Sequence, residues 1–113
     1  MQFMMQGQNT IVANSTTDNV LAGQRYESPQ FDCLGTIYGN GSAAGLRAEL
    51  NVGGVSITPP IVVNASNRLP VVPDDLLVSE WECVGGSQVQ VTVVNTTGGN
   101  LVFFWRIDLQ PVE

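Results

Sequence analysis

The side chains able to do acid–base chemistry in this chain are almost all carboxylates, because the sequence contains no histidine and no lysine. Histidine is the commonest general base, so its absence excludes serine-triad catalysis and argues against a zinc site. A carboxylate pair of the glycosidase kind remains. Asp74 and Asp75 are adjacent and diverge, whereas Glu80 and Glu82 share the outward face of one predicted strand. Neither pair has the burial that raises a catalytic pKa, so we expect no enzymatic activity.

Two kinds of ligand site can still be considered. Asp74 and Asp75, with neighbouring carbonyl groups, have the hard oxygen atoms that calcium prefers, but no EF-hand spacing surrounds them. They could instead cap a helical turn or pair with Arg68. Cys33 and Cys83 match no metal spacing and lie on the apolar phase of their segments. We expect two buried free thiols, with a disulfide as the alternative, and no cofactor.

The elements that position these residues are predicted to be β-strands. Gly (12) and Pro (6) separate short runs rich in Val, Ile, Thr and aromatic residues, and none of these runs has the period of a useful helix. The clearest unit is LRAELNVGGVSI (46–57), in which alternating residues flank a Gly-Gly turn. Pairing Val52 with Val55 sets Leu50 opposite Ile57, so both strands would share one apolar face.

A second hairpin is predicted from SQVQVTVVN (87–95) and LVFFWRIDL (101–109). The odd-numbered residues are apolar in both segments, and a loop through Thr96-Thr97-Gly98 would place odd residues beside odd residues. The odd face is therefore expected to be core. The even face is polar except for Val94, Val102 and Phe104, which would form one apolar patch near the turn.

Further strands are predicted at residues 10–14, 19–27, 31–38, 59–63 and 76–84. A chain of 113 residues is long enough for one domain with a real core. Seven or eight short strands at this spacing indicate an all-β, single-domain antiparallel β-sandwich, of which the jelly roll is one type.

The remaining segments are expected to lie outside the strands. Residues 64–76 are predicted to form a long crossing connection, because Pro70 and Pro73 exclude a central strand there. Residues 1–9 have no turn or strand signal and are expected to be an extended N-terminal arm. The sandwich domain would then span residues 10–113.

Composition limits the partners of the chain. Charged residues make up 12% of the sequence and the net charge is −6. An acidic chain with four arginines lacks the basic surface that binds phosphate backbones or anionic membranes, so we expect neither nucleic acid nor membrane as a partner. The sequence has no secretory signal and no run long enough to span a bilayer, which predicts a soluble protein.

Apolar residues outside the predicted core suggest assembly. Val94, Val102 and Phe104 would be exposed on one hairpin, and the arm carries Phe3, Met4 and Met5. A monomer rarely exposes such groups, so we expect these six residues to bind a partner, with the patch against a neighbour and the arm across another subunit. In the alternative interpretation, the arm folds back over the patch within one chain.

Two tryptophans could serve a different function. Trp81 and Trp105 could stack against a sugar ring, but both lie on the phase assigned to the core, where packing is the expected role. An exposed tryptophan in a groove would favour a soluble carbohydrate-binding module, assisted by calcium at Asp74 and Asp75.

Three segments have a pattern of strands and turns that can be compared with known proteins: TTDNVLAGQRYE (16–27), NRLPVVPDDLLV (67–78) and VGGSQVQVTVVNTTGGNLVFFWRIDLQPV (84–112). In these segments the chain resembles small decoration or cement proteins of bacteriophage capsids. The similarity covers most of the chain as a pattern of strands and turns, without a diagnostic motif. It implies a non-enzymatic β-sandwich that is assembled in the host cytoplasm into the virion, binds the major capsid protein, and forms homo-oligomers, often trimers.

Overall fold

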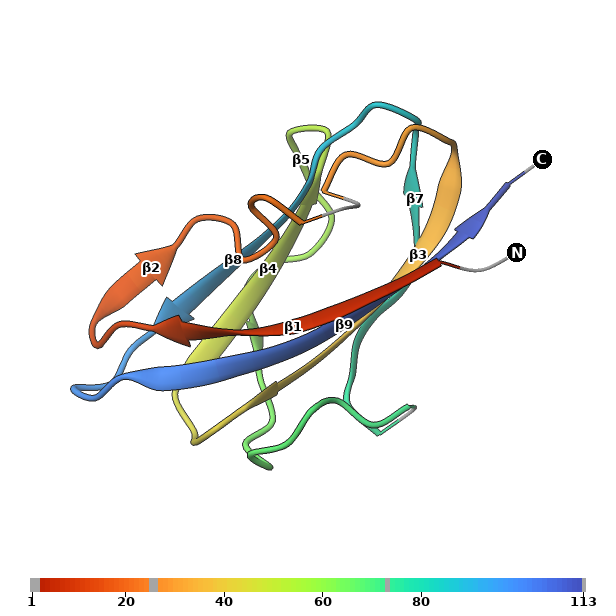
Figure 1. The fold of residues 1–113 in the computed structure, drawn as a ribbon. Coiled ribbons are helices and arrows are strands. Elements are labelled where there is room, and N and C mark those ends of the chain that lie inside the picture. Colours follow the sequence, from red (N-terminus) through yellow and green to blue (C-terminus); the bar gives the residue numbers. More distant parts are fainter. Residues whose placement is uncertain (1–2, 25–26, 73, 113) are drawn as a thin grey trace.

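The computed structural model describes residues 3–24, 27–72 and 74–112. This part of the chain folds into β-strands and contains no helix, as the sequence predicts (Figure 1). The strands are β1 (Phe3–Ile11), β2 (Ser15–Thr17), β3 (Cys33–Gly41), β4 (Leu46–Val52), β5 (Val55–Ser56), β6 (Ile61–Val62), β7 (Leu76–Cys83), β8 (Val89–Asn95) and β9 (Leu101–Pro111).

The strands form two antiparallel sheets that pack face to face, which confirms the predicted β-sandwich. The first sheet has the order β1-β9-β3-β7, and the second has the order β2-β8-β4-β5, with β6 also paired to β4. Figure 1 shows the two layers, with β1, β9 and β3 in one and β2, β8 and β4 in the other. Most connections therefore cross from one sheet to the other, and the seams between the sheets lie beside their edge strands.

The core lies between the sheets and is built by alternation along the strands. Inward side chains on β4, β8 and β9 are less than a tenth exposed, and those that contribute are Leu46, Ala48, Leu50, Val52, Val89, Val91, Val93, Phe103, Trp105, Ile107 and Leu109. These are the residues whose period of two predicts burial. Val20 and Leu21, from the segment after β2, complete the core and are fully buried.

The first predicted hairpin is confirmed in its register. Val52 pairs with Val55 across the Gly-Gly turn, and the Ile57 N–H donates to the Leu50 carbonyl at 2.8 Å. The second strand is only two residues long and lies at the edge of its sheet, so Val55 and Ile57 stay exposed instead of joining the core. The shared apolar face is therefore buried on β4 alone.

The second predicted hairpin is wrong in its pairing, although its core face is confirmed. β8 belongs to the second sheet and β9 to the first, so the loop after β8 carries the chain across the sandwich. Asn95 holds this crossing, because its amide donates to the carbonyls of Ile11 and Gly99 at 2.9 Å. The odd-numbered residues of both strands face each other across the core. A hairpin would bury the same residues, so the alternation of the sequence fits both arrangements.

The predicted N-terminal arm is also wrong for the residues that the structure describes. Residues 3–9 belong to β1, which pairs with β9 in a continuous register from Phe3 opposite Leu109 to Ile11 opposite Leu101. Met5 and Ile11 enter the core. Residues 1 and 2 lie outside the described residues. The strand could not be predicted from alternation, because residues 6–10 are a run without large apolar side chains. An edge strand can form with few apolar residues.

Two glycines on the strands make room for the tryptophans of the core. An added Cβ at Gly35 would lie 2.3 Å from Cζ2 of Trp81, and one at Gly7 would lie 2.8 Å from Cζ2 of Trp105. Both indoles therefore lie flat against a neighbouring strand at positions where no other residue fits without a shift.

Gly35→Ala is expected to lower the free energy of unfolding by about 1–3 kcal/mol, because the rigid Trp81 ring cannot move away without repacking the core. Urea denaturation followed by tryptophan fluorescence measures the effect. Gly98→Ala is the control, since a Cβ there meets nothing within 4 Å. Equal midpoints for the two variants would show that the indole is not packed against β3.

Candidate functional site

The residues predicted to bind a partner lie on different surfaces. Val102 and Phe104 are partly buried on the outer face of the first sheet, where Phe104 lies between Gln8 of β1 and Asn40 of β3. Val94 lies in the second sheet, between Thr16 and Arg47. The single apolar patch expected from the hairpin is therefore wrong, because its members are on two sheets.

The three residues of the predicted arm are also divided. Met5 is buried in the core, and Phe3 is partly buried with its ring 5.1 Å from that of Phe31. Met4 is exposed on the outer face of the first sheet, in line with Asp108 of β9. A partner-binding role for these residues stays a prediction, but they cannot act as one surface.

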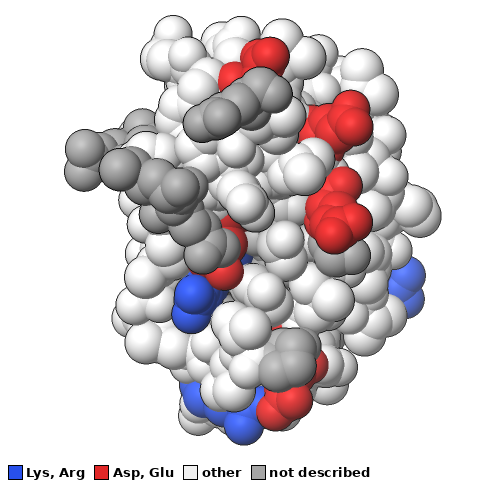
Figure 2. Space-filling model, turned by 90° about the vertical axis from the view of Figure 1, so that its right-hand side faces the viewer, with Lys and Arg blue, Asp and Glu red and all other residues white. Residues whose placement is uncertain are grey.

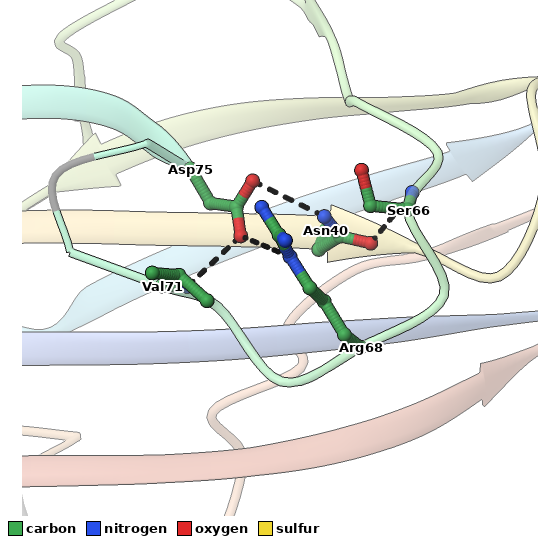
Figure 3. Close-up of polar contacts among 5 residues, drawn as sticks. All are labelled: Asn40, Ser66, Arg68, Val71 and Asp75. Atoms are coloured by element: carbon green, nitrogen blue, oxygen red, sulfur yellow. Dashed lines mark hydrogen bonds and ion pairs between the residues drawn. The ribbon is translucent and has the colours of Figure 1, made fainter.

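The carboxylate of Asp75, just before β7, is buried and accepts three hydrogen bonds (Figure 3). Its Oδ2 accepts from the Val71 N–H at 2.9 Å and from Nε of Arg68 at 3.4 Å, and its Oδ1 accepts from the Asn40 amide at 3.2 Å. Asn40, itself fully buried, accepts from the Ser66 N–H at 3.0 Å. The cluster thus ties the connection after β6 to the end of β3.

The charge of Asp75 is stabilised inside this cluster. Burial alone acts to raise the pKa of the carboxyl, but the hydrogen bonds from Val71, Arg68 and Asn40 outweigh burial and hold the pKa below its usual range. The predicted pairing of Asp75 with Arg68 is confirmed. Because these donors occupy both oxygens, and Asp74 is exposed beside it, the geometry favours a structural role over calcium binding. The described residues hold no group of three or more Cys, Asp or Glu placed for a metal ion.

The two tryptophans pack in the core, as expected. Trp105 is 0% exposed, and its indole N–H donates to Oδ1 of Asn9 at 2.9 Å. Trp81 is 3% exposed, and its indole N–H has no hydrogen-bond partner among the described residues. Neither ring offers an open face for a sugar, so the structure gives no support to the carbohydrate-binding alternative.

An apolar groove lies along the seam between the edge strands β5 and β7. It has a volume of about 550 Å³ and includes Trp81 and Glu82 of β7. Its exposed apolar side chains are Val55 (63%), Ile57 (39%) and Val84 (68%). We call this surface the β5–β7 groove.

The pattern of the sequence does not predict this groove, for an identifiable reason. Val55 and Ile57 have the alternation of a core strand, and Val84 continues the apolar run of β7, so all three resemble core residues. In the structure Val55 belongs to a two-residue edge strand, and Ile57 and Val84 lie just beyond the ends of β5 and β7, at Ser56 and Cys83, so all three stay exposed. Only the short loops rich in Gly and Pro that follow these residues give a local signal of such an ending.

The cysteines lie directly opposite each other on β3 and β7, and both are buried and free, as predicted. Burial is the main cause that raises the pKa of Cys33 to about 12, and the neighbouring Cys83 contributes to the same shift. Burial also raises the pKa of the Cys83 thiol. Both side chains therefore stay protonated at neutral pH, which makes them packing residues instead of nucleophiles.

Comparison with known proteins adds no assignment: no family model and no curated protein matches the sequence. The described part of the chain also has no helix of the length and apolarity needed to cross a membrane.

Asp75→Asn is expected to destabilise the protein by about 1–3 kcal/mol at pH 7, because an amide cannot accept from all three donors. The folded pKa is lowered, so the contribution of the carboxylate is complete above the ordinary aspartate pKa of about 3.9 and is lost as the pH falls through the folded value. Urea titrations of both proteins between pH 7 and pH 3 should show the difference narrowing below pH 4. A difference in stability that stays constant with pH would mean that the charge of Asp75 does not contribute to stability.

The thiols of the folded protein are expected to react with Ellman's reagent only at the rate of unfolding, because both are buried and protonated. Complete reaction should follow at once in denaturant. Rapid labelling of the native protein would contradict the packing of β7 against β3.

Proposed function

We propose that this protein is a non-enzymatic structural protein of a bacterial virus. In this proposal it decorates or cements the shell of the virion after synthesis in the host cytoplasm, associates with copies of itself and binds the major capsid protein. The observation that carries the proposal is the β5–β7 groove, in which Val55, Ile57 and Val84 expose apolar surface at a seam between the sheets. Such a surface is typical of a site for another protein.

The order of the strands supports the same class of protein. One sheet has the order β1-β9-β3-β7 and the other has the order β2-β8-β4-β5, so most consecutive strands of the chain lie in alternate sheets. Two interleaved Greek keys have this arrangement. This favours the jelly-roll type of sandwich, which is common in viral capsid domains and also in lectins. Because the fold serves both functions, the choice depends on the surface, and the buried tryptophans favour protein binding over sugar binding.

The low charge of the surface fits a protein that works by close packing. Figure 2 shows one face of the molecule, on which most of the surface is uncharged and the charged side chains lie in separate small groups. Full burial of one Val or Ile side chain stabilises a complex by about 1.5–3 kcal/mol. The part of this free energy that exceeds the entropy cost of association appears as affinity. Three such side chains in one groove are therefore enough to dominate a contact.

The test uses shells assembled from the major capsid protein of the virus whose genome encodes this chain. The protein should co-sediment with these shells, and Val84→Asp should weaken binding at least about tenfold, because it places a charge in the groove.

Val62→Asp is the matched control for this experiment. Val62 is as exposed as Val84, at 66%, but lies on β6 outside the groove. It should bind like the unchanged protein, and neither substitution should alter the thermal midpoint. Failure of the unchanged protein to bind, or equal loss in both variants, would refute the proposed role of the groove.

A further inference from the structure

The two edges of the first sheet differ in how they are protected. At the β7 edge, Glu80 and Glu82 are exposed, and the register with β3 shifts between the pairs at Gly35 and Ile37. Glu80 has a φ of 54°, a left-handed conformation that is costly for a residue with a side chain. Charges and a bulge are the devices by which an edge strand avoids pairing with another chain.

The β1 edge carries none of these devices. Its nine residues, FMMQGQNTI, include no charged residue and no proline, and its register with β9 runs without a shift. In the described part of the chain, no strand pairs with the other edge of β1. A long, regular and uncharged edge is a template for strand pairing, so the sheet is open to extension on this side only.

The sequence of β1 is suited to pairing with itself. Gly7 is at its centre, with Gln6 and Gln8 on either side. In an antiparallel pair about a two-fold axis through Gly7, Gln6 lies opposite Gln8 of the second copy, and Met4 lies opposite its Thr10. All four side chains are exposed on the outer face of the sheet. The amides can hydrogen-bond across the strands, and the glycine places no side chain on the axis.

Electrostatics favour the same approach. Each chain has a net charge of −6, so two copies repel one another over most orientations. The β1 edge itself is uncharged, and Arg106, which lies opposite Gln6 on β9, is paired with Asp108 at 3.0 Å. The strip around β1 is therefore close to neutral. Contact there costs less than contact at the acidic β7 edge.

We propose that β1 pairs antiparallel with β1 of a second copy, so that the two four-stranded sheets join into one continuous sheet. The inference specifies the self-association part of the proposed function and rests on that proposal only for its biological role. Because the contact uses the same surface on both copies, it closes at two chains. The solution species is then a dimer and not the trimer that the resemblance implies.

Light scattering after size exclusion, over a range of concentrations, tests the inference. The unchanged protein should have twice the 12.1 kDa mass of one chain. The double variant Gln6→Glu, Gln8→Glu sets like charges opposite each other twice, so it should raise the dimer dissociation constant at least about tenfold. The matched variant Gln6→Glu, Gln8→Lys sets opposite charges there and should remain a dimer.

The two variants share the change at Gln6 and differ only at Gln8, so the comparison tests the register. Circular dichroism and thermal midpoints establish that both are folded. A monomer or a trimer of the unchanged protein overturns the inference, and so does equal behaviour of the two variants.

Shell binding is measured separately from the dimer mass. A dimer that fails to bind shells refutes shell binding and leaves this inference standing, whereas a monomer that binds shells refutes self-association, and with it this inference, and leaves shell binding standing. Val84→Asp, which lies away from β1, should keep the dimer mass.

Discussion

The burial of the inward face of β9 is the constraint on which the rest of the structure depends. β9 lies between β1 and β3, and Phe103, Trp105, Ile107 and Leu109 are all fully buried. Removing each from water stabilises the fold by about 1.5–3 kcal/mol as an upper estimate. Two strands must therefore flank β9, and the second sheet must cover it. The first requirement makes residues 3–11 a strand, and Trp105 requires Gly7 within it.

A second constraint comes from the long connections, whose backbone groups have no hydrogen bonds within a sheet. The segment from β6 to β7 crosses the outer end of β3, and its polar groups need partners there. Asp75 and Asn40 supply them, through side-chain contacts and through the Gly39 N–H, which donates to the Asp75 carbonyl at 2.9 Å. The cluster fixes the start of β7 beside the end of β3.

The surfaces that remain follow from how the sheets end. On one side, the two-residue strand β5 and the end of β7 leave a seam with exposed valines and an isoleucine. On the other side, β1 runs its whole length beside β9 and leaves a regular, uncharged edge. The proposed function needs one surface for copies of the chain and another for the capsid protein, and the β1 edge and the β5–β7 groove differ in chemistry in the way that this proposal requires. The β5–β7 groove offers apolar side chains, and the β1 edge offers backbone hydrogen bonds.

The sequence by itself determined the fold class, the buried face of β4, β8 and β9, the register of the Gly-Gly hairpin and the burial of both tryptophans and both cysteines. All of these follow from alternation and turn chemistry, which are properties of a few consecutive residues. Only the tertiary structure decided that β8 and β9 lie in different sheets, that residues 3–9 form an edge strand, and that Val55 and Val84 are exposed. The physical reason is that alternation determines which side of a strand is buried, whereas the neighbour of a strand is chosen by hydrogen bonds between segments far apart in the chain. Two strands of a hairpin and two strands facing each other across a core satisfy the same pattern.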